Sequence, residues 1–150
     1  MELKTFGDGL QFGMELESAL LCVFEQMANA VLPADLQEVM RSFAQACKKR
    51  KTYLETLLKD SIYSDMDTGV FQPIGCLESS RYTVDWNDIQ VAAVPGMFEN
   101  MMIAEEKTGL FYNDFAAQIK SQRNAIALRF RKMAEETVHQ ASKLKELKFV

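Results

Sequence analysis

The sequence is poor in the residues that interrupt helices, with three prolines and seven glycines among its 150 residues. Most of both lie outside the long segments of helical periodicity, which favours a helical fold. Histidine is rarer still, since His139 is the only one. The chain also lacks a Gly-rich phosphate loop, a nucleophile elbow and a Cys-x-x-Cys pair. It therefore offers no support for the enzyme classes that these motifs mark.

Cysteine, long apolar runs and strong net charge are scarce as well. Cys22, Cys47 and Cys76 are an odd number without metal-motif spacing, which is typical of reduced thiols in the cytoplasm. The longest apolar run, 19–24, is too short to span a bilayer, and the first ten residues lack a signal-peptide pattern. The formal net charge of −4 gives no attraction to phosphate backbones. We therefore expect a cytoplasmic protein that binds neither membranes nor nucleic acid.

What the chain does have is helical periodicity. Apolar residues recur at helical spacing in four segments, 9–31, 34–59, 95–120 and 122–147. Asp8 with Gln11 can form a capping box at the start of the first segment. The intervening segment 61–94 breaks the pattern and holds scattered aromatic residues, namely Tyr63, Phe71, Tyr82 and Trp86. Because a structureless loop of this length is uncommon, these aromatics indicate that the segment packs across the helices.

The two halves of the chain repeat each other. Glu17 and Phe24, shifted by 88 positions, match Glu105 and Tyr112. Such a repeat predicts two helical hairpins joined by one long crossover, 61–94. We expect an all-α single domain over the whole chain. Its fold would be an antiparallel four-helix bundle with one long crossover, the topology of ferritin-like bundles.

Glu17 and Glu105 lie in the middle of otherwise apolar helix faces. A carboxylate there is costly unless it is paired or bound to metal, and two at matched positions favour a shared site. Glu105 with Tyr112, Glu17 with Phe24, and the stretch 104–147 resemble the ferritin-like superfamily, and rubrerythrin-type proteins in particular. That resemblance implies two iron or manganese ions in the bundle core. They would be held by a Glu on each of two helices and a Glu-x-x-His pair on each of the others, and would support oxygen- or peroxide-dependent redox chemistry.

The Glu-x-x-His pairs are where this sequence departs from the family. Glu136 and His139 have the right spacing, but helical geometry turns them roughly 120° and 180° away from the inward Phe130. Alignment on the apolar positions instead puts Thr137 and Gln140 in the ligand register. The same alignment puts Arg50 and Tyr53 there in the first half. We therefore expect neither half to keep its Glu-x-x-His pair, and His139 to face solvent.

A buried polar network without metal is the leading interpretation. Its expected members are Glu17, Arg50, Tyr53, Glu105, Tyr112, Thr137 and Gln140. The planar guanidinium of Arg50 can bind two carboxylates, so it can replace the metal charge between Glu17 and Glu105. The chain would then be a ferritin-like protein with a degenerate dimetal site, no metal cofactor, and a structural or partner-binding role.

Other interpretations stay open at this point. A one-residue π-bulge would rotate Glu136 and His139 inward and give a dimetal oxidoreductase that binds iron or manganese through Glu17, Glu105, Glu136 and His139. Whether the chain is an enzyme is therefore undecided. A small-molecule pocket beside 61–94, lined by Tyr53, Tyr112 and Trp86, is a third interpretation. Wide apolar surfaces on the first and third helices would suit a homodimer.

Overall fold

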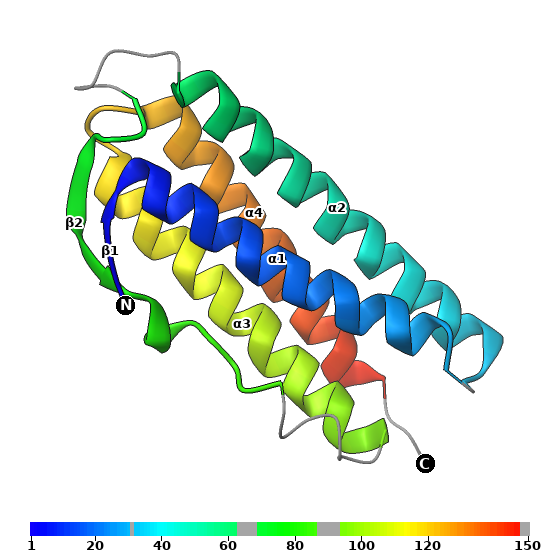
Figure 1. The fold of residues 1–150 in the computed structure, drawn as a ribbon. Coiled ribbons are helices and arrows are strands. Elements are labelled where there is room, and N and C mark those ends of the chain that lie inside the picture. Colours follow the sequence, from blue (N-terminus) through cyan, green and yellow to red (C-terminus); the bar gives the residue numbers. More distant parts are fainter. Residues whose placement is uncertain (31, 63–68, 87–93, 148–150) are drawn as a thin grey trace. The chain divides into compact units, whose positions relative to one another are not determined.

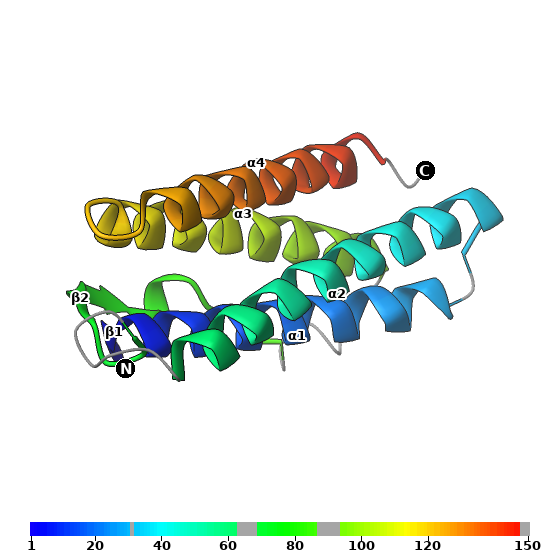
Figure 2. The same ribbon diagram turned by 90° about the horizontal axis from the view of Figure 1, so that it is seen from above.

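Four helices and a small two-stranded sheet make up the computed structural model, which describes residues 1–30, 32–62, 69–86 and 94–147 (Figures 1 and 2). The elements are β1 (Glu2–Thr5), α1 (Phe6–Ala28), α2 (Ala34–Ile62), β2 (Pro73–Glu78), the short 3₁₀ helix η1 (Ser79–Arg81), α3 (Val94–Ile119) and α4 (Asn124–Glu146). The four predicted helices are confirmed with small shifts at their ends. The sheet was not predicted.

The chain divides into two compact units, 5–73 and 1–4 with 74–150. The unit 5–73 is the hairpin of α1 and α2, whose apolar faces meet along their length. Its core includes Phe24 and Phe43, with ring centroids 5.5 Å apart in an edge-to-face arrangement. Few residues separate the two helices, and the Pro33 carbonyl accepts the first backbone hydrogen bond of α2 from Gln37 N. Proline suits this position because it has no N–H to satisfy.

The start of α1 differs from the prediction. The Thr5 Oγ1 accepts a hydrogen bond from Asp8 N at 3.1 Å, and Thr5 N donates to Asp8 Oδ2 at 3.2 Å. These two bonds form a capping box in which Asp8 is the third helical residue. The predicted box of Asp8 with Gln11 is therefore wrong, because the helix begins three residues earlier than its apolar stripe suggested.

The second unit is built on the hairpin of α3 and α4. Aromatic rings fill its core, with Phe115 stacked on Phe111 at 5.5 Å and edge-on to Phe130 at 5.1 Å. The two helices lie close together at Gly109. A Cβ atom there would lie 2.7 Å from Thr137 Oγ1, so glycine allows this close contact.

Residues 74–86 lie along α3 and are held against it by hydrogen bonds that involve α3 side chains. Gly75 N donates to Gln118 Oε1 at 2.8 Å, and Lys107 Nζ donates to the Thr83 carbonyl at 3.1 Å. Between them Tyr82 is buried against Phe111, at 5.3 Å between ring centroids. This part of the crossover is therefore packed against a helix, as the sequence predicted.

A short hydrogen bond anchors Tyr82 to the same helix. The Tyr82 hydroxyl donates to Asp114 Oδ2 at 2.6 Å, and Arg81 Nη1 lies 3.6 Å from the same oxygen. Burial, and then the Asp114 carboxylate, raise the pKa of the Tyr82 hydroxyl above its ordinary value of 10.0. The neutral hydroxyl is therefore the form that this site favours.

The other crossover aromatics differ from Tyr82. Phe71 is exposed and Trp86 is half-buried. Tyr63 lies outside the described residues.

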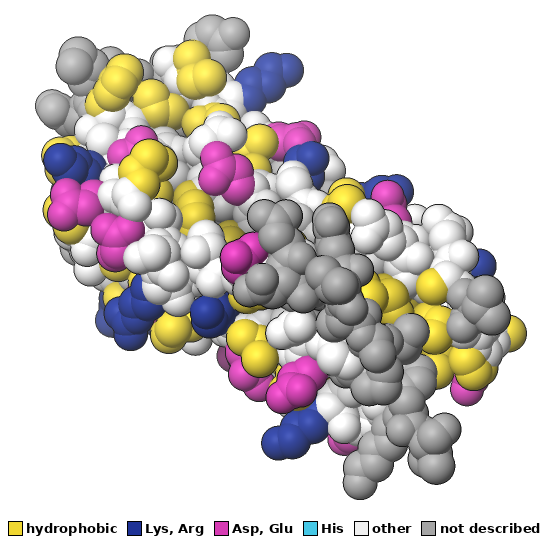
Figure 3. Space-filling model, turned by 60° about the horizontal axis from the view of Figure 1, so that its bottom comes forward, with side chains coloured by type: hydrophobic (Ala, Val, Ile, Leu, Met, Phe, Trp, Pro, Cys, Tyr) yellow, Lys and Arg dark blue, Asp and Glu magenta, His cyan; other side chains and the backbone are white. Residues whose placement is uncertain are grey.

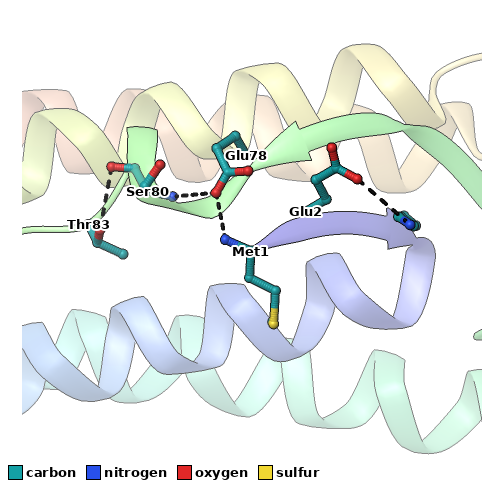
Figure 4. A network of polar contacts seen from close by, with 6 residues as sticks. Met1, Glu2, Glu78, Ser80 and Thr83 are labelled. Carbon is teal, nitrogen blue, oxygen red and sulfur yellow. Dashed lines mark hydrogen bonds and ion pairs between the residues drawn. The ribbon is translucent and has the colours of Figure 1, made fainter.

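The N-terminal strand pairs with β2 in an antiparallel manner. Ser79 N donates to the Met1 carbonyl at one end of the pair, and Phe6 N donates to the Gln72 carbonyl at the other. The terminal ammonium of Met1 lies 2.6 Å from Glu78 Oε1 and lowers the pKa of that carboxyl group. Figure 4 shows this ion pair beside the two strands. The ion pair and the backbone bonds together hold the first residues against β2.

The described residues form no membrane-spanning helix and, on the face drawn in Figure 3, no patch of one charge. Among the described residues, no helix combines the length and apolarity that a membrane crossing needs. On the face drawn in Figure 3, the described acidic and basic side chains are interspersed and do not gather by sign.

Candidate functional site

The most unusual feature of the hairpin α1–α2 is an ion pair in its interior. Glu17 of α1 is 0% exposed and Arg50 of α2 is 3% exposed. Arg50 Nε donates to Glu17 Oε2 at 2.7 Å. A distance this short is that of a charge-assisted hydrogen bond between a guanidinium and a carboxylate. The structure therefore contains the pairing of Arg50 with Glu17 that the sequence predicted.

Cys47 completes this cluster. It lies three residues before Arg50 on the same face of α2 and is fully buried. Arg50 Nη2 lies 3.5 Å from Cys47 Sγ, a contact that we did not predict from the sequence. The apolar periodicity placed Cys47 on the inner face, but could not tell that its sulfur would accept a guanidinium N–H.

Burial makes the two charges depend on each other. Removing an ion from water costs several kcal/mol in a real protein, by order of magnitude, and only a close partner of opposite charge compensates for it. Guanidinium is the weakly hydrated cation best suited to such a position. As a pair the two groups are neutral, so α1 and α2 can pack around them as they would around an apolar core.

The second unit carries a buried polar group of its own. Glu105 of α3 is 0% exposed, and Thr108 and Tyr112 lie buried on the same helix. From α4, Thr137 and Gln140 are buried as well. This places four residues of the predicted network in the interior of the protein, and adds Thr108.

Each of the two threonine hydroxyls donates a hydrogen bond to a backbone carbonyl of its own helix. Thr108 Oγ1 donates to the Ala104 carbonyl at 2.8 Å, and Thr137 Oγ1 donates to the Ala134 carbonyl at 2.8 Å. Threonine commonly satisfies its hydroxyl in this way inside a helix. The spacing of Thr108 three residues after Glu105 was the signal that could have found it.

Glu136 and His139 do not point inward. Both are exposed on α4, which runs without interruption from Asn124 to Glu146. Their exposure agrees with the helical phase deduced from Phe130 and Leu144, both of which are buried. No π-bulge of the kind that would turn Glu136 and His139 into the core occurs in this helix.

Tyr53, the remaining predicted member, is half-buried on α2. Within the part of the chain that the structure describes, no group of three or more His, Cys, Asp and Glu side chains could hold a metal ion. The predicted pocket of Tyr53, Tyr112 and Trp86 draws on both units and stays a prediction.

Comparisons with protein-family models, with curated proteins and with solved structures find no match for this chain. The resemblance to rubrerythrin-type proteins accordingly stays a prediction. The evidence on the function of this chain therefore comes from its own residues, above all from Glu17 and Arg50.

Proposed function

We propose that this chain is a ferritin-like helical protein in which an arginine occupies the place of the metal, and that it acts as a structural or partner-binding protein. The observation that supports this is the buried ion pair between Arg50 and Glu17, at 2.7 Å. In a carboxylate-bridged metal site Glu17 would present its oxygens to a cation. Here one of these oxygens already accepts a hydrogen bond from a fixed positive charge.

A guanidinium in this position also opposes metal binding. A divalent cation approaching Glu17 would be repelled by Arg50 in surroundings where charges are weakly screened. Glu136 and His139, which the oxidoreductase interpretation requires, are exposed on α4. No observation therefore favours the dimetal oxidoreductase as a second function.

The proposal extends to Glu105. Its burial and its match to Glu17 in the internal repeat support a network in which Arg50 serves both carboxylates. The guanidinium has five N–H donors, enough for two carboxylates and the Cys47 sulfur.

Metal content tests the proposal directly. Protein purified without chelators is soaked aerobically with ferrous iron, desalted and subjected to elemental analysis. The expected iron content is no higher than in an unrelated control protein treated in parallel. About two irons per chain with an oxo-bridged absorption band would overturn the proposal and establish a dimetal site.

A double-mutant cycle tests the part played by Glu105. Free energies of unfolding are measured for Arg50→Met, Glu105→Gln and the double variant. A coupling energy above about 1 kcal/mol would support a direct interaction, since distant sites add to within about 0.5 kcal/mol. Glu106→Gln is the matched control, because Glu106 is the exposed neighbour of Glu105. Equal coupling for Glu105 and Glu106 would remove Glu105 from the network.

A further inference from the structure

An open depression of about 230 Å³ lies between the C-terminal part of α1 and the first half of α2. All the residues that line it belong to the unit 5–73. Its buried residues are Ala28 and Ala44, one from each helix. Because both side chains are single methyl groups, they leave space where larger residues would fill the groove between the helices.

The exposed rim of this depression is polar and has an excess of positive charge. Arg41 and Lys48 lie seven residues apart on α2, which is two helical turns on one face. Glu25 of α1 lies across from them, and its Oε1 is 3.5 Å from Lys48 Nζ. Arg41 has no ion-pair partner among the described residues. The rim thus holds two cations against one carboxylate.

Two primary amides add further donors. Asn29, which caps α1, and Gln45, between the two basic residues of α2, line the same depression. Each amide supplies two N–H groups, and the guanidinium of Arg41 supplies five in a planar fork that matches carboxylate and phosphate oxygens. The partial negative charge at the C-terminal end of α1 opposes an anion, but it is weaker than the full charges on α2.

We propose that this depression binds a small oxyanion, the phosphate or carboxylate group of a metabolite, with Arg41 as its principal ligand. The volume is below the roughly 300–1,000 Å³ of pockets for drug-sized molecules, so the ligand is small. The chain has a net charge of −4, but the local excess of positive charge at the depression attracts an anion. The inference does not depend on the proposed function, because it uses none of the buried network.

The test is titration of the full chain with sodium phosphate and, separately, with sodium malonate, followed by NMR at constant ionic strength. The expected result is saturable binding with a Kd of about 1 mM or tighter for at least one anion. Shifts would centre on the amides of Asn29 and of 41–48. Phosphate alone indicates a phosphorylated ligand, malonate alone a carboxylate, and both the shared oxyanion chemistry.

Two variants make the test specific. Arg41→Gln should weaken binding by about tenfold or more, because it removes a charge-assisted contact. Lys49→Gln is the matched control, since Lys49 is exposed on α2, outside the lining, and loses the same charge. Both positions are on the surface and glutamine is a good helix former, so both variants should fold. The proposal is overturned if neither anion binds saturably, or if the two variants have equal effects.

Discussion

Replacing Arg50 by methionine should strongly lower the free energy of unfolding. Methionine keeps the length and the apolar stem of arginine, but removes the charge 2.7 Å from Glu17 Oε2. Glu17, which is 0% exposed, would then be a buried carboxylate without its cation. Breaking a buried ion pair in this way costs about 3–5 kcal/mol. That is a large part of the 5–15 kcal/mol by which typical domains are stable.

Urea unfolding followed by far-ultraviolet circular dichroism measures this loss. The transition midpoint of Arg50→Met should fall by about 1–5 M, which is the loss of 3–5 kcal/mol divided by a slope of about 1–3 kcal/mol per M. Lys49→Met, at the exposed neighbouring position, should change stability by no more than about 0.5 kcal/mol. The double variant Glu17→Leu with Arg50→Met removes both charges and should recover part of the loss. Unfolding of Arg50→Met at the wild-type midpoint would refute the reasoning.

Three further predictions concern the unit built on α3 and α4. Gly109→Ala should lower stability, because overpacking against Thr137 Oγ1 costs about 1–3 kcal/mol, more than the gain in helix propensity. Adding Thr137→Ala should restore part of the loss in urea unfolding. Tyr82→Phe should cost about 1–2 kcal/mol, since it removes the hydrogen bond to Asp114. Because the folded-state pKa of Tyr82 is raised, wild-type stability should fall from about pH 10 upward, and that of Tyr82→Phe should fall less. The pKa of Glu78 is lowered, so its contribution is present above the ordinary value of 4.5 and lost as acid protonates it. Glu78→Gln should therefore lose less stability than the wild type during acid titration.

Helical periodicity predicted the four helices well because each has a long apolar stripe. It missed the sheet because β1 has four residues, of which Leu3 alone has a fully buried side chain. So short a strand has no readable alternation, and its partner lies far along the chain. The start of α1 was misplaced for a related reason. The Thr5 and Asp8 cap precedes the stripe, and its threonine is also the last residue of β1.

The burial of the polar residues could be predicted because the position of a residue on the helix determines whether its side chain points inward. Glu17, Arg50, Glu105 and Thr137 all lie inside, as their place in the apolar stripes required. What the sequence does not encode by spacing is which donor meets which acceptor. The contact of Arg50 with Cys47 depends on the rotamer of a long side chain, which helical periodicity does not determine.

The pairing of β1 with β2 has a consequence for the order of folding. Met1 and Glu78 are 77 positions apart in the chain, so their ion pair closes a long loop. During synthesis the first strand leaves the ribosome well before its partner exists, whereas α1 and α2 can already form their local hairpin. The first strand therefore cannot pair until residues 73–79 have been made, after α1 and α2 but before α3 and α4.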